Sequence, residues 1–413
     1  MGGLYKKLMD RILRGAIHRG QFQVVWPDGE QSAYGDGQGS LVTVEISNPA
    51  WLRRLVANPA LAVGEAYMDE GLVPVGCTMH ELLVLLMENI RGQHVPVLAW
   101  NARIRRLLRP LMQANGVGRA RRNVAHHYDL NGRLYALFLD RDRQYSCGYF
   151  AQGNETLEQA QAAKKHHIAA KLRLHRPGLS VLDIGCGWGG MALTLARDYG
   201  ARVTGITLSQ EQLTEARTRA LAAGLSDRVS FALMDYRDVA GTFDRVVSVG
   251  MFEHVGVPNY PSFFATVKRC LEPDGVALLH SIGRFAGPSA TNPWITKYIF
   301  PGGYSPALSE VFGPLEASGL RTTDVEILRL HYAKTIAHWR RRFAANRDTI
   351  AAIYDERFCR MFEFYLSGSE LSFRTSDHMN FQIQMVRNQE ALPLTRDYLF
   401  EEERQTSLAE ASD

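Results

Sequence analysis

The 413-residue sequence contains only five cysteines, and no two of them form a C-x-x-C pair. An odd number of widely spaced cysteines argues against a disulfide framework, and the missing pair argues against a zinc site. No apolar run approaches the roughly 18 residues that a membrane-spanning helix needs, and the first residues lack the continuous apolar core of a signal peptide. We therefore expect a cytoplasmic protein with reduced cysteines, no bound metal and no membrane-spanning segment.

Acidic residues are absent from residues 101–123, which contain seven arginines although the net charge of the chain is only +4. Such a block suits an anionic surface, either phospholipid or nucleic acid. Nucleic acid is the weaker alternative, because the sequence has no helix-turn-helix, zinc-finger or RNP-type pattern. Residues 4–17 alternate apolar and basic side chains at helical spacing and predict a basic amphipathic helix. This helix either docks on its own domain or lies at a lipid interface.

The chain is longer than one typical domain, so two domains are expected, each with its own core. Residues 1–120 mix short strand-like and helical pieces, such as "SLVTVEIS" and "MHELLVLLMENI". We predict a small α+β domain here, ending in the basic connector. Residues 121–413 form the predicted second domain.

In that second domain, helical patterns alternate with the short apolar runs "SVLDIG", "ARVTGITL", "RVSFALM", "FDRVVSVG" and "GVALLHSI". Runs of this length that are rich in Val, Ile and Leu are typical of buried parallel strands. The alternation predicts an α/β fold, a doubly wound and mainly parallel sheet with helices on both faces. The pattern ends near residue 284, and we expect "NPWITKYIFPGGYSP" to be a loop or lid.

Four glycines fall within "GCGWGG", residues 185–190, directly after the first of these strands. A lone G-x-G-x-x-G motif is weak evidence. At the end of a strand of a doubly wound sheet, however, bare backbone lets a ligand approach a helix N-terminus. Asp183 would repel a pyrophosphate there but suits an ammonium or sulfonium group. The next strand also lacks the acidic residue that NAD requires, so the pattern favours S-adenosylmethionine.

Polar residues follow the next two strands. Thr207, Ser209 and Gln212 come after the second strand, where Ser209 and Gln212 fit an S-x-x-Q capping box as well as a ligand crevice. The two roles are compatible, because a cap at a strand's carboxyl end also faces the crevice. Asp235 and Tyr236 of "LMDYRD" follow the third strand, where an acceptor and a flat ring could flank adenine. An ordinary acidic loop is the alternative.

The chain resembles the cyclopropane fatty acid synthase family, which includes the mycolic acid cyclopropane synthases, in "AHHYDLNGRLYALFLD", "QYSCGYF", "LDIGCGWGG", "VSVGMFEHVG", "LLHSIG", "NPWITKYIFPGG" and "HYAKTIAHW". The resemblance runs from about residue 42 to about residue 387. It implies a Rossmann-like methyltransferase domain and a smaller N-terminal lipid-binding domain. The implied reaction transfers a methylene group from S-adenosylmethionine to the cis double bond of an unsaturated phospholipid acyl chain. Close relatives methylate lipid chains without closing a ring, and that alternative stays open.

The reaction leaves a carbocation on the acyl chain, so water must be kept out, and a base must then remove a proton before the ring closes. The resemblance implies that this base is a bound bicarbonate. By motif, the residues that hold it are Cys147, Glu253, His280, the amide of Ile282, and Tyr332. Even without the family, Glu253 and His280 follow buried strands, where a charged group needs a reason. A Glu–His pair that braces the loop is the structural alternative.

For the donor, the resemblance implies Tyr145, Ser146, Gly185, Gly187, Thr207, Leu208, Gln212, Asp235 and Tyr236. We add Tyr128, Asp183 and Ser209 as candidate donor-binding residues. Aromatic rings that could stabilise the cation are Tyr128, Tyr145, Phe150 and Tyr332. The expected partner is unsaturated phospholipid, with the enzyme peripheral at the inner membrane face; a homodimer is an open alternative to a monomer.

Overall fold

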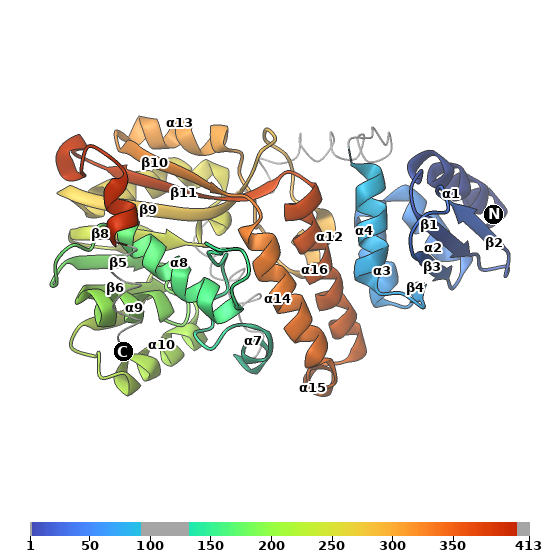
Figure 1. The fold of residues 1–413 in the computed structure, drawn as a ribbon, viewed down its shortest axis with the longest axis horizontal. Helices are drawn as coiled ribbons and strands as arrows, with labels where there is room; N and C mark the ends of the chain where they lie inside the picture. Colours follow the sequence, from blue (N-terminus) through green and yellow to red (C-terminus); the bar gives the residue numbers. More distant parts are fainter. Residues whose placement is uncertain (1, 92–131, 403–413) are drawn as a thin grey trace. The chain divides into compact units, whose positions relative to one another are not determined.

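The computed structural model describes residues 2–91 and 132–402 (Figure 1). They form two compact units that interleave along the chain. The first unit contains residues 2–91, 289–301 and 336–377, and the remaining described residues form the second. Residues 289–301 and 336–377 therefore cluster with the N-terminal segment, although their place in the sequence suggested the second domain. The boundary expected near residue 120 and the basic connector lie outside the described residues.

The first unit is an α+β unit around a four-stranded sheet with the order β2-β1-β3-β4. β1 runs parallel to β3, and the other neighbours are antiparallel. Its elements are α1 (Gly2–Ala16), β1 (Gln21–Val25), β2 (Gln31–Tyr34), β3 (Leu41–Ile46), α2 (Pro49–Ala57), α3 (Pro59–Met68), β4 (Leu72–Val75), α4 (Met79–Ile90), α12 (Pro293–Tyr298), α15 (Arg347–Ile353) and α16 (Glu356–Thr375). The strand and helix expected from "SLVTVEIS" and "MHELLVLLMENI" are β3 and α4.

The amphipathic helix expected near the N-terminus is α1. Its residues Tyr5, Met9 and Leu13 pack against the core of the first unit. On the other side, Leu4 and Leu8 are 69% and 41% exposed. The helix therefore docks on its own domain with one apolar stripe and leaves two leucines in solvent.

The segment expected to be a loop or lid contains the short helix α12. The side chain of Asn292 caps it by accepting the N–H of Trp294 (2.8 Å). Trp294 is fully buried and packs edge-on against Phe364, with ring centroids 4.7 Å apart. A Cβ on Gly64 would lie 2.4 Å from the Trp294 indole nitrogen, so only glycine admits the ring. The loop expectation is wrong for residues 293–298, because the buried indole fixes them as a helix.

The second unit is built around a seven-stranded sheet with the order β10-β11-β9-β8-β5-β6-β7. Its elements are α7 (Gly132–Phe138), α8 (Leu157–Lys171), β5 (Ser180–Ile184), α9 (Gly190–Tyr199), β6 (Arg202–Thr207), α10 (Gln210–Ala222), β7 (Val229–Leu233), η1 (Tyr236–Asp238), β8 (Phe243–Val249), η2 (Phe252–His254), η3 (Val257–Asn259), α11 (Tyr260–Cys270), β9 (Leu271–Arg284), α13 (Leu308–Ser318), β10 (Arg321–Leu328), β11 (His378–Val386) and η4 (Gln389–Ala391). The helix α14 (His331–Ala345) begins in this unit and ends in the first.

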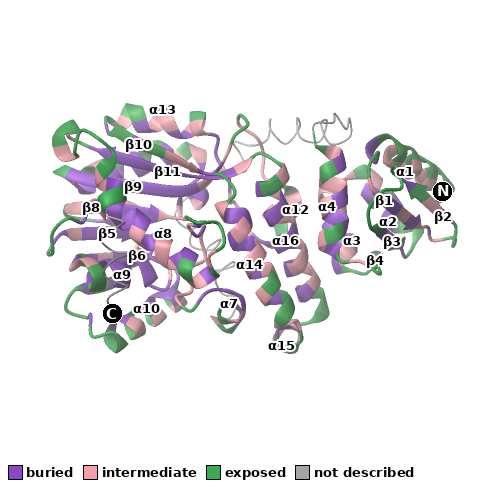
Figure 2. Cartoon of the chain, in the orientation of Figure 1, coloured by how far each residue is buried: buried purple, intermediate pink, exposed green. Residues whose placement is uncertain are grey.

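The doubly wound fold is confirmed. Strands β5 to β9 pair in parallel, as expected, and β11 adds an antiparallel edge together with β10. Alternate residues of the central strands pack on opposite faces. Leu182 and Val246 join α11 and α13, whereas Val181 and Val247 join α8, α9 and α10. Figure 2 shows these strands as the buried centre of the unit.

The chain leaves β5 toward β6 and β7 and then returns to β8 on the other side of β5. In an open α/β sheet, ligands bind at the carboxyl ends of the strands beside such a switch point. Within residues 2–91 and 132–402, no helix has the length and apolarity of a membrane span.

Candidate active site

A cavity lies at the carboxyl ends of β5, β6, β7 and β8. Ten candidate donor-binding residues line it: Tyr145, Ser146, Asp183, Gly185, Gly187, Thr207, Leu208, Gln212, Asp235 and Tyr236. Ser209 instead caps α10, where its hydroxyl accepts the N–H of Gln212 (3.3 Å). Tyr128 lies outside the described residues. The structure thus brings together candidate residues from three separate strand ends, those of β5, β6 and β7, and from the segment between α7 and α8.

The glycine turn forms one wall of this cavity. Gly185 and Gly187 have φ angles of +85° and +55°, in the left-handed region that favours glycine. A Cβ on Gly185 would lie 2.8 Å from Cβ of Met251, so no side chain fits there. A Cβ on Gly187 would meet no atom within 4 Å. The backbone at Gly187 is therefore open to a ligand.

Asp183 is buried at the end of β5, and its Oδ2 has no hydrogen-bond partner among the described residues. Burial raises the pKa of this carboxyl to about 7, although the charge of Lys164 opposes the shift. A buried carboxylate without a partner is costly. It suits a ligand that brings an ammonium group.

Glu253 lies in η2, just after β8. Its Oε1 accepts the N–H of Ile282 (2.7 Å), and its buried Oε2 has no partner among the described residues. Burial raises the pKa of the carboxyl to about 7, against the hydrogen bond from the Ile282 amide that lowers it. The site thus contains a carboxyl group that can exchange a proton near neutral pH.

His280 lies on β9 and is held at both ring nitrogens. The amide nitrogen of Gln382 lies 3.1 Å from Nδ1, and that of Asn380 lies 3.4 Å from Nε2. Burial lowers the pKa of the ring to about 3, so the imidazole is neutral at pH 7. Its hydrogen-bond partners are on β11 and do not include Glu253, and the Glu–His brace considered above is therefore not formed.

Cys147 is fully buried, and burial raises the pKa of its thiol far above the ordinary value. The thiol therefore stays protonated, and it donates to the carbonyl of Gly148 (3.3 Å). The next residue, Gly148, donates its N–H to Thr335 Oγ1 (3.0 Å) on α14. Tyr332, also buried, lies one turn earlier on the same helix.

The side chain of Ser146 comes close to Gly250, the residue that follows β8. Cβ of Ser146 lies 3.9 Å from the position that a Cβ would take on Gly250. Gly250 in turn donates its N–H to the carbonyl of His280 (3.0 Å). Of the five candidate residues, Glu253 and Ile282 contact each other directly, and Cys147 and Tyr332 lie on segments joined by the bond from Gly148 to Thr335. None of the five is among the residues that line the cavity.

Residues 117–383 match the sequence profile of the family described as "Mycolic acid cyclopropane synthetase". The chain belongs to this family. Residues 4–91 match a separate domain described as one of unknown function.

Relatives in this family agree with the assignment. The Escherichia coli K12 protein named "Cyclopropane-fatty-acyl-phospholipid synthase" is 39% identical over 349 residues, which cover 84% of this chain and 88% of that protein. A Pseudomonas putida "Probable fatty acid methyltransferase" is 41% identical over 289 residues, covering 67% of this chain and 73% of that protein. The solved structure of mycolic acid cyclopropane synthase CmaA1 with SAH and CTAB has a TM-score of 0.61 and 33% identity, and the match covers 64% of this chain and 97% of that chain. As a member of the mycolic acid cyclopropane synthetase family, the protein is an S-adenosylmethionine-dependent methyltransferase.

Several residues that line the cavity were not singled out from the sequence. Trp188 lines it and donates its indole N–H to Glu211 (3.1 Å). Arg237 also lines it and holds Asp235 with two side-chain hydrogen bonds (2.8 and 2.7 Å). Both sit beside residues that were singled out, so position next to a motif was the available signal. The sequence offered no such signal for Lys164.

The residues present fit the two small ligands that the family resemblance implies. The unpartnered oxygen of Asp183 and the open backbone at Gly187 fit the amino acid part of S-adenosylmethionine. The protonated Cys147 thiol donates to the carbonyl of Gly148 (3.3 Å), so a bond to bicarbonate would require that contact to change. Glu253 Oε2 has no partner among the described residues and can bond to an oxyanion in its protonated form. The Ile282 amide is already bonded to Glu253, so its direct contact with bicarbonate would require that bond to change.

We expect donor binding to release a proton from Asp183 below neutral pH. The free carboxyl, with a pKa of about 7, is largely protonated at pH 6, and an incoming ammonium favours its ionised form. Affinity for S-adenosylhomocysteine should therefore rise as the pH increases toward 7. Calorimetry at pH 6 in two buffers of different ionisation enthalpy should detect the release. Asp183→Asn should abolish it, whereas Glu253→Gln should retain it; release that survives in Asp183→Asn would contradict this assignment.

Proposed function

We propose that this methyltransferase is a cyclopropane-fatty-acyl-phospholipid synthase, which adds a methylene group across the cis double bond of an unsaturated phospholipid acyl chain. The observation that carries the proposal is the buried Glu253 carboxyl, with one oxygen uncommitted, just after the strand end that borders the donor cavity. Ring closure needs a proton acceptor that is shielded from water, and a simple methyl transfer to a polar nucleophile does not. The identity to the E. coli synthase over most of both chains also supports it.

S-adenosylmethionine, when bound, supplies an electrophilic methyl group, which the weakly nucleophilic alkene attacks. We assign the binding of its amino acid part to Asp183 and to the glycine turn. Bicarbonate, when bound, supplies the proton acceptor. We assign its retention to Cys147, His280 and Tyr332.

Glu253 then holds or releases a proton at Oε2, because its pKa of about 7 allows both states at neutral pH. The burial of Cys147, Glu253 and His280 limits the access of water, which would otherwise trap the cation. The chain's own residues thus bind, shield and exchange protons, and the cation forms on the lipid.

The alternative is a lipid C-methyltransferase that forms the same cation but does not close the ring. The P. putida relative, named a probable fatty acid methyltransferase, favours keeping this candidate. Both reactions can add one CH2 to the acyl chain, so mass alone does not separate them.

Product analysis tests the proposal. The purified enzyme, incubated with methyl-labelled S-adenosylmethionine and vesicles of unsaturated phospholipid, should yield labelled lipid whose proton spectrum contains cyclopropyl signals. Olefinic signals beside a new methyl or methylene group would instead support the C-methyltransferase. Absence of labelled lipid from a folded, donor-binding enzyme would contradict both.

We also propose peripheral attachment to the inner membrane face, while the oligomeric state stays open between a monomer and a homodimer. The exposed side chains of Leu4 and Leu8 lie on a helix that also carries Lys7 and Arg11. Apolar and basic side chains together suit an anionic lipid surface.

A further inference from the structure

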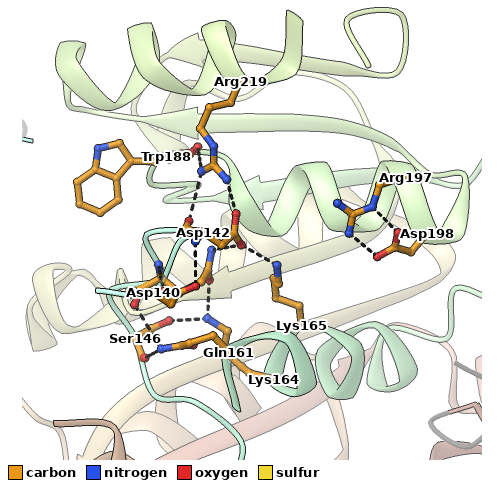
Figure 3. Close-up of polar contacts among 11 residues, drawn as sticks. Asp140, Asp142, Ser146, Gln161, Lys164, Lys165, Trp188, Arg197, Asp198 and Arg219 are labelled. Atoms are coloured by element: carbon orange, nitrogen blue, oxygen red, sulfur yellow. Dashed lines mark hydrogen bonds and ion pairs between the residues drawn. The ribbon is translucent and has the colours of Figure 1, made fainter. Parts of the chain in front are cut away.

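Lys164 is a buried cation that the proposed chemistry leaves unused. It lies on α8 and is 0% exposed. Its Nζ donates to Gln144 Oε1 and to Ser146 Oγ, the latter at 2.9 Å (Figure 3). No carboxylate of the described residues lies within ion-pair distance of Nζ, whereas the neighbouring Lys165 pairs with Asp142 at 2.6 Å. The hydrogen-bond partners of this buried ammonium are neutral, and the carboxylates of Asp140 and Asp142 act on it only through space. A direct hydrogen-bonded anion is therefore missing around a charge that is costly to bury.

The contact with Lys164 determines the hydrogen-bonding role of the Ser146 hydroxyl. An ammonium group only donates, so Ser146 Oγ must be the acceptor of this bond. The hydroxyl keeps one proton to donate, and none of the described residues accepts it. Ser146 lines the donor cavity, and its carbonyl is held by Gln161 (2.9 Å). The hydroxyl proton is therefore left to bond with a ligand in the cavity.

Gln144 is fixed in the same way. Its Oε1 accepts from Lys164, and its Nε2 donates to Asp142 (3.1 Å), which is itself held by Lys165 and Arg219. Figure 3 shows Asp142 with Lys165 and Arg219, beside the glycine-turn residue Trp188. The wall formed by Gln144 and Ser146 is thus rigid, and Lys164 decides the direction of its hydrogen bonds.

We propose that Lys164 is a positioning residue that makes the Ser146 wall of the cavity a binding site for a ligand oxyanion. It acts through Ser146, which it turns into a hydrogen-bond donor, and its positive charge favours an anion nearby. Although burial lowers the pKa of Lys164 to about 8, the ammonium remains largely charged at pH 7. This inference rests on the proposed function. Two ligands of that reaction could supply the oxyanion: the carboxylate of the methyl donor and bicarbonate.

Two nucleosides separate a positioning role from a structural one. S-adenosylhomocysteine carries the carboxylate, and 5′-methylthioadenosine lacks the amino acid part. For the full-length Lys164→Met enzyme, calorimetry should show affinity for S-adenosylhomocysteine reduced by about 10- to 100-fold, the effect of losing one charge-assisted hydrogen bond. Affinity for 5′-methylthioadenosine should be nearly unchanged. Ser146→Ala should give the same selective loss, and the double variant should be no worse than the weaker-binding single variant.

Lys268→Met is the matched control, because it removes a part-buried ammonium that donates to a neutral acceptor, the carbonyl of Ser318 (2.7 Å), outside the network of Gln144, Asp142 and Ser146. It should leave the ratio of the two affinities as in the unmodified enzyme. Equal weakening of both nucleosides by Lys164→Met would mean a purely structural role and would overturn the proposal. If Lys164→Met does not fold, Ser146→Ala carries the test, and an unchanged ratio there together with an unchanged bicarbonate requirement overturns the proposal.

A bicarbonate arm identifies the source of the oxyanion. If the nucleoside ratio stays constant in both variants while half-maximal methyl transfer needs at least about 10-fold more bicarbonate, the oxyanion is bicarbonate rather than the donor carboxylate. If neither the nucleoside ratio nor the bicarbonate requirement changes, the proposal is wrong. The nucleoside arm contains no lipid, so its result stands even if the lipid product is not a cyclopropane.

Discussion

Glu253→Gln is expected to lower kcat by about 10³-fold or more while donor affinity persists. The amide can keep the hydrogen bond that Glu253 accepts from Ile282 at 2.7 Å, so the loop should keep its conformation. The buried Oε2, however, is replaced by an NH2 group that can neither accept nor release a proton at neutral pH. Single-turnover transfer of labelled methyl groups to lipid, together with calorimetry of S-adenosylhomocysteine, measures the two effects separately.

Glu272→Gln is the control for this prediction. Glu272 lies near the amino end of β9, and its carboxyl accepts the hydroxyl of Thr242. The substitution makes the same chemical change away from the strand ends that form the site, and turnover should be unaffected. Full activity of Glu253→Gln would show that the proposed base site is wrong.

Gly187→Val should raise the dissociation constant of the donor by at least about 100-fold, equal to about 2.7 kcal/mol. A Cβ at this position meets no protein atom within 4 Å, so the new methyl groups enter the space of the cavity that Gly187 lines. The φ angle of +55° adds strain for a β-branched residue. Calorimetry with S-adenosylhomocysteine measures the loss, and thermal unfolding reports the strain.

Gly224→Val separates strain from obstruction. Gly224 has a φ angle of +65° and equally open space around its Cβ position, but it follows α10 outside the cavity. The two variants should lose similar stability, and only Gly187→Val should lose donor binding. Normal donor binding by Gly187→Val would place the donor elsewhere in the molecule.

The sequence predicted strands β5 to β9 because their apolar runs are continuous and short. It did not predict β11, although this strand lies inside the sheet between β9 and β10. Asn380, Gln382 and Gln384 are buried on it and interrupt the apolar pattern. Their partners include the ring of His280 and the carbonyl of Lys171, which are distant in sequence. Local hydrophobicity cannot reveal a strand whose polar residues are satisfied by distant groups.

Most residues that line the donor cavity could be predicted because they belong to short motifs that follow a strand, whereas Tyr145 and Ser146 lie between two helices and were taken from the family resemblance alone. Parallel strands bring their carboxyl ends to one edge, so residues of separate motifs gather there without any knowledge of their contacts. Asp183 and Gly187 both lie on this edge. By contrast, the bond of Glu253 to Ile282 joins residues 29 positions apart, and the sequence alone could not distinguish it from the Glu–His brace.

The sequence by itself therefore determined the doubly wound sheet, the edge at which the donor motifs meet and the family of the chain, since apolar runs, glycine turns and motif order are local properties. Only the tertiary structure decided that residues 289–301 and 336–377 join the N-terminal unit, and that Lys164 reaches Ser146 across 18 positions. Burial and hydrogen-bond partners depend on segments that fold together from distant parts of the chain. They set the proton affinity of Glu253 and the direction of the Ser146 hydroxyl, which no local pattern contains.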